Sequence, residues 1–565
     1  PGAGDPGPRA AAPRRTGRTA FLQLLIDEGV DHLFGNPGTT ELPIMEAVPQ
    51  FPQLRYVLGL QESIVLGMAD GFARATRRLA ACNLHCTPGL GHAMGALYSA
   101  KFTGSPLIVT AGQYELGHGL TEPLLYEPLL PIAAPLVKWA VEVERVQDLP
   151  RIVHRAAKVA LSPPTGPVFI SLPGSILDDE AELDLGSPTR VQTATRPSDE
   201  VLRALAARML AAESPVLLAG RELAEQHAFD EAGELARLLG AGVYLESVAC
   251  NTRFPAEHPL ALGDIGRNQP KVRAALQPHD LLICLGGDLL RMSPASPVDP
   301  LPDGMPVIHL SERDWELGKN YPTEWAVRAS VRETLQALLP LLRAARDDRY
   351  AAAAEQRAAA IAERNWSARR RERVAALQGR SGASPIDQDY LMWRVSELLP
   401  PDVVIVEEML TSAPAAAALL RINDPDGYYG LASGGLGFGM AGAIGVSLAR
   451  PGRPVAALIG DGSAMYSIQA LWTAAHLKLP ITYLIVNNRG YRIIKDRLRA
   501  MRGTDRFVAM DLDDPPLDFV ALANGMGVPA RRVIDAAQID DALRRAFARG
   551  GPSLIEVVVD NGYPN

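Results

Sequence analysis

Asp461 stands between two glycines, Gly460 and Gly462, directly after a run of apolar residues at 455–459. Such a run is typical of a buried parallel strand, and the glycines allow the chain to turn sharply and to approach a ligand closely. The carboxylate of Asp461 is a hard oxygen ligand of the kind that Mg²⁺ prefers. Ser463 and the amides after it are predicted to open a helix, whose N–H groups favour phosphate oxygens.

Asn488 is the second polar residue that this chemistry needs. A helix predicted at residues 468–478 and a strand predicted at residues 481–486 separate it from Asp461. This is the size of one strand-helix-strand unit, so the two strands are expected to be neighbours that end at the same edge of a sheet. For the Gly-Asp-Gly sequence alone, a generic phosphate site or a tight turn is the simpler alternative.

Gly-Asp-Gly followed at this distance by Asn-Asn resembles the thiamin-diphosphate motif of the 2-oxo-acid decarboxylase and acetohydroxyacid synthase superfamily. The resemblance implies that Mg²⁺ is bound by Asp461, Asn488 and the backbone carbonyl of Gly490. The residues that it places at the cofactor are Gly434, Leu436, Thr411, Ser412, Asp461, Gly462, Ser463, Asn488 and Tyr491.

Glu62 is the candidate for activating such a cofactor. It ends an apolar segment and opens a helix predicted at residues 63–73. A carboxyl group is costly to bury without a partner, so this one could share a proton with a ring nitrogen. The resemblance implies a hydrogen bond to N1′ of the aminopyrimidine, whereas a helix N-terminal carboxylate is the simpler alternative. Because members of this family bind the cofactor between subunits, Glu62 would serve cofactor held by Asp461 of the partner subunit.

The glycine-rich stretch 431–439 would line the middle of the cofactor. By the resemblance, Leu436 holds the cofactor in its bent shape and the carbonyl of Gly434 accepts a hydrogen bond from its amino group, which is catalysis by positioning. A packed glycine-rich helix start is the alternative. Thr411 and Ser412 follow a predicted strand and would donate to the diphosphate, although hydroxyl groups at such places are often helix caps.

Within the superfamily the chain resembles benzoylformate decarboxylase and its relatives, over nearly all of its length. The segments that carry this resemblance are residues 35–39, 83–86, 93–97, 105–113 and 471–475. It implies that the hydroxyl of Thr39 contacts substrate and that His85 delivers a proton, as an imidazole titrating near neutral pH can. The further residues that we place near the substrate are Gln113, Leu124, Ser293, Ile494 and Arg497.

Three positions depart from that family. Ser293 falls where the family has a second catalytic histidine, and serine cannot act as a general acid near neutral pH. His92 stands where the family has asparagine, either as a compensating catalytic residue or as an inert one. Arg497 replaces a phenylalanine, and its guanidinium would suit a second carboxylate or a phosphate. The alternative is that Lys495, Arg497 and Arg499 form a solvated helix face.

The 565 residues are 47% hydrophobic and 21% charged, with a net charge of −8. This composition is typical of a globular enzyme, and it gives no indication of a nucleic-acid partner or a membrane span. Four cysteines do not make a disulfide framework and suit the cytoplasm.

Alternating strand and helix patterns predict α/β domains with doubly wound parallel sheets. The expected divisions are a disordered tail (1–17), a pyrimidine-binding domain (18–185), a central domain (198–345), a helical linker (346–384) and a diphosphate-binding domain (385–565).

We therefore expect a lyase or transferase that uses thiamin diphosphate and Mg²⁺ to decarboxylate a 2-oxo acid. The product is an aldehyde, or a 2-hydroxyketone when an acceptor aldehyde or second 2-oxo acid is joined to it, and the missing second histidine favours this carboligation. A homodimer or homotetramer with active sites between subunits is expected. The alternatives are an acetolactate-synthase-like carboligase, a benzaldehyde-lyase-like C–C lyase, and a catalytically inactive cofactor-binding scaffold.

Overall fold

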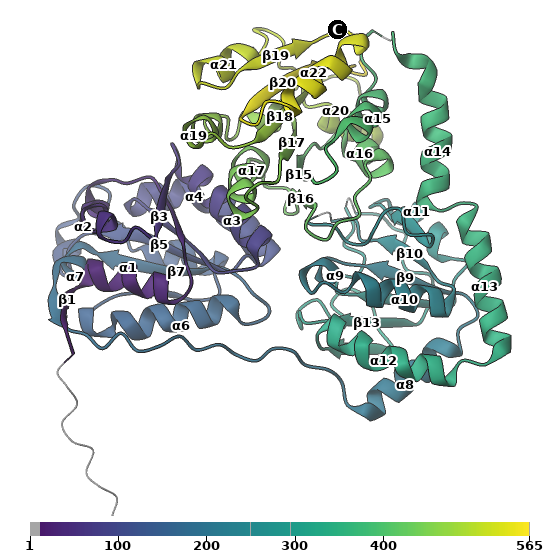
Figure 1. The fold of residues 1–565 in the computed structure, drawn as a ribbon, viewed down its shortest axis with the longest axis horizontal. Helices are drawn as coiled ribbons and strands as arrows, with labels where there is room; N and C mark the ends of the chain where they lie inside the picture. Colours follow the sequence, from purple (N-terminus) through teal and green to yellow (C-terminus); the bar gives the residue numbers. More distant parts are fainter. Residues whose placement is uncertain (1–11, 249, 294, 383, 564–565) are drawn as a thin grey trace, which may run out of the picture. The chain divides into compact units, whose positions relative to one another are not determined.

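The computed structural model describes residues 12–248, 250–293, 295–382 and 384–563. The chain divides into two compact units, Pro1–Val191 and Gln192–Asn565. The first contains one six-stranded sheet and the second contains two (Figure 1). Neighbouring strands in all three sheets are parallel, and helices connect them, so the predicted class of three doubly wound α/β sheets is confirmed.

The sheet of the first unit has the strand order β3-β2-β4-β5-β7-β6. Its central strands are buried at every position, as expected where helices cover both faces. One face packs on α1 and α6, while Phe34 on the other contacts Phe72 of α3. The strands are β2 (His32–Gly35), β3 (Arg55–Leu58), β4 (Ala80–Leu84), β5 (Leu107–Gln113), β6 (Ala140–Glu142) and β7 (Val168–Pro173). The helices are α1 (Gly17–Asp27), α2 (Leu42–Ala47), α3 (Glu62–Thr76), α4 (Cys86–Thr103), α5 (Leu129–Ala133), α6 (Leu149–Leu161) and α7 (Gly174–Asp178).

The first sheet of the second unit has the order β11-β10-β9-β12-β13-β14. Its larger core lies against α8, α10 and α12, and a smaller one lies against α11. The strands are β9 (Pro215–Ala219), β10 (Gly242–Leu245), β11 (Ala261–Asp264), β12 (Leu281–Leu285), β13 (Val307–Ser311) and β14 (Trp325–Arg328). The helices are α8 (Asp199–Leu210), α9 (Glu222–Glu225), α10 (Phe229–Leu239), α11 (Gln269–Leu276) and α12 (Val331–Ala345).

The second sheet of this unit has the order β16-β15-β17-β18-β20-β19, which repeats the pattern of the first unit's sheet. The strands are β15 (Val404–Glu408), β16 (Tyr428–Gly430), β17 (Val455–Gly460), β18 (Ile481–Asn487), β19 (Ala530–Val533) and β20 (Ser553–Val558). The helices are α15 (Gln388–Leu398), α16 (Ala413–Leu419), α17 (Phe438–Ala449), α18 (Asp461–Ala464), α19 (Ala470–Leu477), α20 (Arg492–Arg502), α21 (Phe519–Gly525) and α22 (Ile539–Phe547).

Two crevices for ligands follow from these strand orders. In an open parallel sheet, ligands bind beyond the carboxyl ends of the strands at the point where the strand order reverses. That point lies between β2 and β4 in the first unit and between β15 and β17 in the second. In the first unit, Glu62 comes after β3 and His85 after β4. In the last sheet, Asp461 comes after β17 and Asn488 after β18. The topology therefore places them beyond the carboxyl ends of strands at or next to these points.

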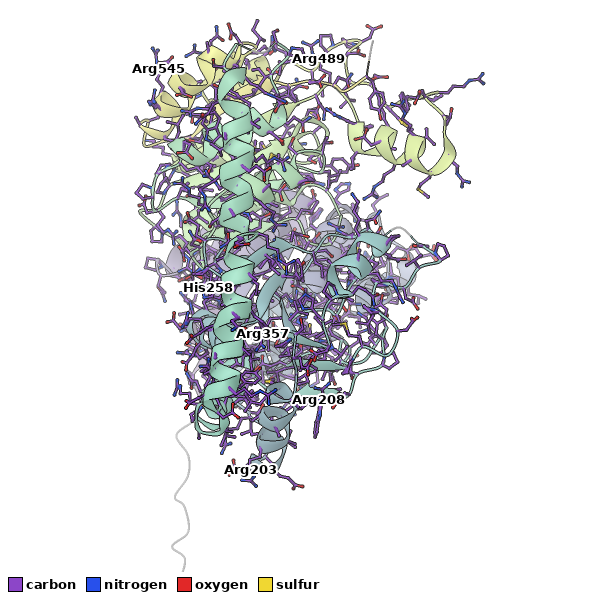
Figure 2. The ribbon with its side chains drawn as sticks, turned by 90° about the vertical axis from the view of Figure 1, so that its right-hand side faces the viewer. Arg203, Arg208, His258, Arg357, Arg489 and Arg545 are labelled. Carbon is purple, nitrogen blue, oxygen red and sulfur yellow. The ribbon has the colours of Figure 1, made fainter. Side chains whose placement is uncertain are left out.

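Two helices, α13 (Asp348–Ala362) and α14 (Trp366–Leu377), connect the two sheets of the second unit and run along one side of it (Figures 1 and 2). Most of their residues are exposed or half-buried, and a few side chains anchor them to the sheets. Arg357 donates to the carbonyl of Leu239 at 2.7 Å. The indole N–H of Trp366, which is 5% exposed, donates to the carbonyl of Ala417 at 2.9 Å.

The expected disordered tail at residues 1–17 is wrong for its last part. Strand β1 (Arg14–Thr16) pairs antiparallel with β8 (Glu180–Glu182), and Thr16 caps α1. This pairing joins residues far apart in sequence, which the Pro- and Arg-rich composition of the segment does not reveal. Residues 1–11 lie outside the described residues.

Among the helices that the structure describes, none has the length and apolar character needed to cross a lipid bilayer.

Candidate functional site

The turn after β17 is built around Asp461. Its carboxylate is buried, with Oδ1 accepting from the amide of Gly462 at 2.8 Å and Oδ2 from that of Gly490 at 3.1 Å. A Cβ atom at position 462 would lie 2.7 Å from the ring of Tyr491, so only glycine fits between the turn and this half-buried ring. Ser463 is buried in the single turn of α18, and the next helix starts only at Ala470, later than expected.

Asn488 meets Asp461 at a shared donor. The amide of Gly490 lies 3.1 Å from Oδ1 of Asn488 as well as 3.1 Å from the Asp461 carboxylate. The structure therefore brings together the three residues that were predicted to bind Mg²⁺. No group of three His, Cys, Asp or Glu side chains that could bind a metal occurs among the described residues. The predicted set does not need one, because it combines one carboxylate with an amide oxygen and a backbone carbonyl.

The charge at this turn also suits a cation. Burial raises the pKa of Asp461 to about 6, although backbone amides offset part of that effect. The hydrogen bonds of its carboxylate come from uncharged amides rather than from a basic side chain. A hard divalent cation would supply the missing positive charge, so the residues present fit Mg²⁺.

Glu408, at the end of β15, is a site residue that the sequence reasoning missed. Its buried carboxylate accepts from the amides of Gly437, at 2.7 Å, and Gly439. It thereby fixes the start of α17, directly after the predicted cofactor residues Gly434 and Leu436. Gly434 is exposed and Leu436 half-buried. The sequence feature that could have identified Glu408 is an acidic residue at the end of an apolar strand.

The predicted diphosphate donors after β15 differ in their surroundings. Ser412 is buried, and its hydroxyl donates to Oε1 of Gln388 at 2.7 Å. It precedes α16, but its side chain does not cap that helix, contrary to the simpler alternative. Thr411 is half-buried. In this arrangement a ligand phosphate would compete with Gln388 for the Ser412 hydroxyl.

In the first unit, Glu62 is the first residue of α3, and the residue is only 8% exposed. Its Oε2 lies 3.0 Å from Nδ1 of His92, and its Oε1 lies 3.5 Å from Nδ2 of Asn36. His92 is thus bonded to the predicted cofactor-activating acid, and whether it is catalytic or inert stays open at this point.

His85 precedes α4 and is held by a second residue that the sequence reasoning missed. Its Nδ1 lies 2.8 Å from Oε2 of Glu41, which is completely buried. The Glu41 carboxylate also accepts from the amides of Gly38 at 2.9 Å and Gly112 at 3.1 Å. With Nδ1 engaged by Glu41, His85 would exchange a substrate proton at Nε2. The signal was the position of Glu41 just after the segment 35–39.

The hydroxyl that joins this group is that of Thr40 rather than the predicted Thr39. Thr40 donates to Oε1 of Glu41 at 2.7 Å, and its Oγ1 lies 3.2 Å from Nδ1 of His85. Thr39 is exposed in the first unit. A substrate contact by Thr39 stays a prediction.

The predicted substrate residues are scattered over both units. Gln113 is buried and donates to the carbonyl of Glu127 at 3.0 Å, which ties down the loop after β5. Leu124 lies in that loop and is 85% exposed. In the second unit, Ser293 and Arg497 are exposed, and Ile494 is 48% exposed. Their substrate contacts stay predictions.

The alternative of a solvated face on α20 is wrong for Lys495, which is the only buried residue described in that helix. Its ammonium group pairs with Asp511 and lies 5.2 Å from the ring of Phe507 and 5.6 Å from that of Tyr563. The helix therefore turns one cation inward and leaves Arg497 outside. Phe507 and Tyr563, the aromatic residues that Lys495 contacts, lie beyond the end of the helix. The sequence of the helix alone therefore does not predict these contacts.

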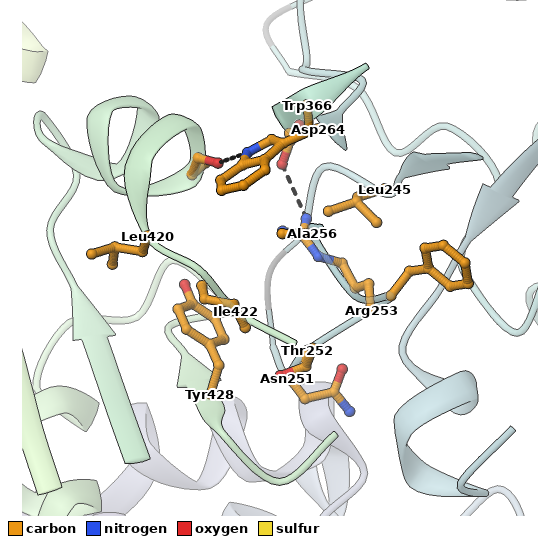
Figure 3. Close-up of a pocket in the computed structure, with 12 residues that line it drawn as sticks. Leu245, Asn251, Thr252, Arg253, Ala256, Asp264, Trp366, Leu420, Ile422 and Tyr428 are labelled. Atoms are coloured by element: carbon orange, nitrogen blue, oxygen red, sulfur yellow. Dashed lines mark hydrogen bonds and ion pairs between the residues drawn. The ribbon is translucent and has the colours of Figure 1, made fainter. Parts of the chain in front are cut away.

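A cavity of about 30 Å³ lies between the two sheets of the second unit, away from all the predicted site residues (Figure 3). Arg253 in its wall pairs with Asp264 at 3.0 Å. Three other polar atoms in the wall have no protein partner: Oδ1 of Asn251, Oγ1 of Thr252 and Nε of Arg253. The cavity has the size and the polar partners for about two water molecules.

Comparison with known proteins decides the family. Models of the thiamine pyrophosphate enzyme N-terminal, central and C-terminal domains match residues 15–123, 202–338 and 411–557. A benzoylformate decarboxylase of Pseudomonas aeruginosa is 33% identical, with 96% of this chain and 98% of that protein covered. The chain belongs to the thiamine pyrophosphate enzyme family. The predicted cofactor thiamin diphosphate and the predicted enzymatic nature are thereby confirmed.

Other relatives cover similar spans. The large subunit of Escherichia coli acetolactate synthase isozyme 1 is 27% identical, with 97% of this chain and 94% of that protein covered. The structure of the Rhodococcus jostii RHA1 thiamine diphosphate-dependent 4-hydroxybenzoylformate decarboxylase superposes with a TM-score of 0.86 at 31% identity. Benzoylformate decarboxylase from Polynucleobacter necessarius gives 0.86 at 30% identity. Each of the two structures covers 97% of this chain and is itself covered to 99%.

Proposed function

We propose that this enzyme decarboxylates a 2-oxo acid with thiamin diphosphate and Mg²⁺, and that it also joins the product to an acceptor carbonyl. Asp461, Asn488 and Gly490 would hold Mg²⁺, and Glu62 would hold the aminopyrimidine ring. When bound, thiamin diphosphate supplies a carbanion that adds to the keto group and takes up the electrons released with CO₂. His85, oriented by Glu41, would deliver the proton that completes an aldehyde product.

One observation favours a catalytic role over an inactive scaffold. Glu62 lies over Gly89 and is bonded to His92, and His85, one turn earlier, is bonded to Glu41. Two pairs of a buried acid and an imidazole thus lie along the first turns of α4. A Cβ atom at Gly89 would lie 3.3 Å from Oε1 of Glu62 and 3.5 Å from Cβ of His85. A scaffold that only binds the cofactor has no need of such paired acid–base groups.

The test of this function is Glu62→Gln. We expect loss of turnover with Mg²⁺-dependent binding of thiamin diphosphate largely kept, because the amide retains the shape but cannot pass on a proton. Turnover is assayed on a panel of 2-oxo acids, with mass detection of aldehyde and CO₂. Unchanged turnover in the variant, or no turnover of the unmodified protein on the whole panel, contradicts the proposal.

Carboligation is supported by the exposed serine at position 293, which offers no second imidazole, and by the acetolactate synthase relatives. The same panel with an added acceptor aldehyde separates the outcomes. A 2-hydroxyketone is expected in addition to free aldehyde. Free aldehyde alone, whatever acceptor is supplied, leaves a simple decarboxylase, and cleavage of a supplied 2-hydroxyketone would favour a C–C lyase.

We infer that the active enzyme is a homodimer or homotetramer in which Glu62 serves cofactor held by Asp461 of the partner subunit. Support comes from the apolar residues Leu120 and Leu124, which are 93% and 85% exposed in the first unit, as at an interface. Co-expressed Glu62→Gln and Asp461→Ala chains should recover about a quarter of the full activity, because random two-fold pairing leaves one intact site in each mixed dimer. No recovery would place both residues in one chain's site.

A further inference from the structure

The pair formed by Glu62 and His92 joins a buried group to an exposed one. The Glu62 side chain is 11% exposed and that of His92 is 60% exposed, with 3.0 Å between Oε2 and Nδ1. A buried carboxyl group that must gain and lose a proton needs a route to solvent. The imidazole provides one, because it binds the carboxylate through one nitrogen and carries a second nitrogen on the same exposed ring.

The helix α4 fixes this arrangement. His85, Gly89 and His92 follow one another at helical spacing along one face, and the missing side chain of Gly89 makes room for the carboxylate. Of the two histidines, His92 is bonded to Glu62, whereas His85 is paired with Glu41. The third neighbour, Asn36, does not titrate. His92 is thus the ionisable side chain bonded to Glu62 among the described residues.

We propose that His92 is a positioning residue that orients Glu62 and relays protons between solvent and that carboxyl group. The proposal rests on the proposed function of Glu62. The proton moves from Nδ1 of His92 to the carboxylate of Glu62. The carboxyl group so formed is the acid that would hydrogen-bond the cofactor's ring nitrogen. The imidazole is left neutral when the cofactor binds, and solvent restores its proton only during turnover. In this scheme the asparagine of the related family keeps the hydrogen bond but has no proton to pass on.

Proton uptake on cofactor binding tests this directly. Thiamin diphosphate with Mg²⁺ is titrated calorimetrically into the cofactor-free full chain in two buffers of different ionisation enthalpy, which gives the number of protons taken up. At about pH 6 we expect the imidazole of His92 in the unmodified protein to supply the proton itself. His92→Asn must take it from the buffer, so we expect it to take up close to one proton more. At about pH 9 the two proteins should agree.

Two further variants make the test specific. His227 is also exposed, on the second unit, and has a backbone φ of 51°, which asparagine tolerates well, so His227→Asn should match the unmodified protein. His92→Gln should match His92→Asn, and circular dichroism of both confirms their folding. Equal proton uptake in the unmodified protein and both His92 variants at about pH 6 would overturn the relay.

The proposed function and the relay fail differently. If Glu62→Gln retains both turnover and proton uptake, the role of Glu62 is wrong. If Glu62→Gln abolishes both while the His92 variants behave as the unmodified protein, only the relay is wrong. Initial rates against pH give a second readout, because a relay variant should slow turnover most where proton supply limits it and approach the unmodified rate elsewhere.

Discussion

At the scale of single residues, three buried carboxylates beyond strand ends have different surroundings. All three accept hydrogen bonds from backbone amides, but Glu41 also faces an imidazole and Asp461 lies beside Asn488. A buried charge is stable only where a partner offsets its lost hydration. The partner therefore indicates what each carboxylate does. Glu41 bonds to a histidine and Glu408 fixes a loop, whereas the place of Asp461 beside Asn488 is what suits the proposed cation.

Replacing Glu41 by glutamine tests its role in orienting His85. The amide keeps the size of the side chain but no longer carries the negative charge that stabilises and orients the imidazolium. We expect turnover to fall roughly 100-fold, the lower range for losing acid–base catalysis, with cofactor affinity nearly unchanged. Steady-state rates and fluorescence titration with thiamin diphosphate measure the two. An equal loss of affinity would instead show that Glu41 maintains the fold of the site.

Replacing Glu408 by glutamine tests how its buried carboxyl group makes the free energy of unfolding depend on pH. Burial raises the pKa of Glu408 to about 8, above the value of about 4.3 expected in an unfolded chain. The folded state therefore holds the proton more tightly, and the contribution to stability that is present below about pH 4.3 is lost as the pH rises through about 8.

As the pH rises from about 5 to 8, the free energy of unfolding should fall in the unmodified protein. It should fall less in Glu408→Gln, because glutamine cannot ionise. The two falls should differ by an amount on the order of a few kcal/mol. Urea unfolding of the cofactor-free proteins at several pH values measures it. Other buried acids contribute equally to both proteins, so parallel curves would show that Glu408 does not titrate in this range.

At the scale of elements, helix α4 determines how closely Glu62 approaches the two histidines. A Cβ atom at Gly89 would lie 3.3 Å from Oε1 and 3.4 Å from Cγ of Glu62, whereas one at Gly91 would meet nothing within 4 Å. Gly89→Ala should displace the carboxylate by a few tenths of an ångström and reduce turnover about tenfold or more. Gly91→Ala should keep activity and add about 0.5–1 kcal/mol of stability. Thermal unfolding and initial rates separate these effects, and equal behaviour would contradict the contact.

Helix α20 presents Arg497 to solvent, and its substrate role can be tested by choice of substrate. If the guanidinium binds a second carboxylate, Arg497→Phe should lower kcat/KM for a dicarboxylic 2-oxo acid by about 10- to 100-fold, as expected for a charged hydrogen bond. The rate with an aromatic 2-oxo acid should hold or rise. Arg502→Phe, exposed on the same helix, is the control. Identical profiles for both variants would leave Arg497 as a solvated residue.

The elements were largely predictable from sequence, but their cross-contacts were not. Continuous apolar runs and the glycine turn encode β17, β18 and Asp461 locally, so the structure matches them closely. The contacts of Glu41 with Gly112, and of Glu408 with Gly437, join segments that no local pattern connects. The inward position of Lys495 likewise depends on Phe507 and Tyr563.

At the scale of the whole molecule, the chain carries two sheets with the same strand order. The sheet of the first unit presents Glu62 and His85 beyond its carboxyl ends, and the last sheet presents Asp461 and Asn488 beyond its own. Neither sheet holds a complete set of groups for the proposed chemistry. Two like frameworks with complementary groups are what the proposed assembly would need, and within the second unit the central sheet is joined to the last one through α14.

That connection can be measured at Trp366, which joins α14 to the last sheet's helix α16 through its bond to Ala417. Trp366→Phe keeps most of the packed ring but leaves the carbonyl of Ala417 without this donor, which should cost about 1–3 kcal/mol and lower the unfolding temperature by a few degrees. Trp315, 79% exposed, provides the matched control, and Trp315→Phe should change stability by less than about 0.5 kcal/mol. Turnover at low temperature should stay unchanged in both, because Trp366 lies at the cavity away from the predicted site residues. Calorimetric scans with equal unfolding temperatures for the two variants would show that this bond does not hold the two sheets together.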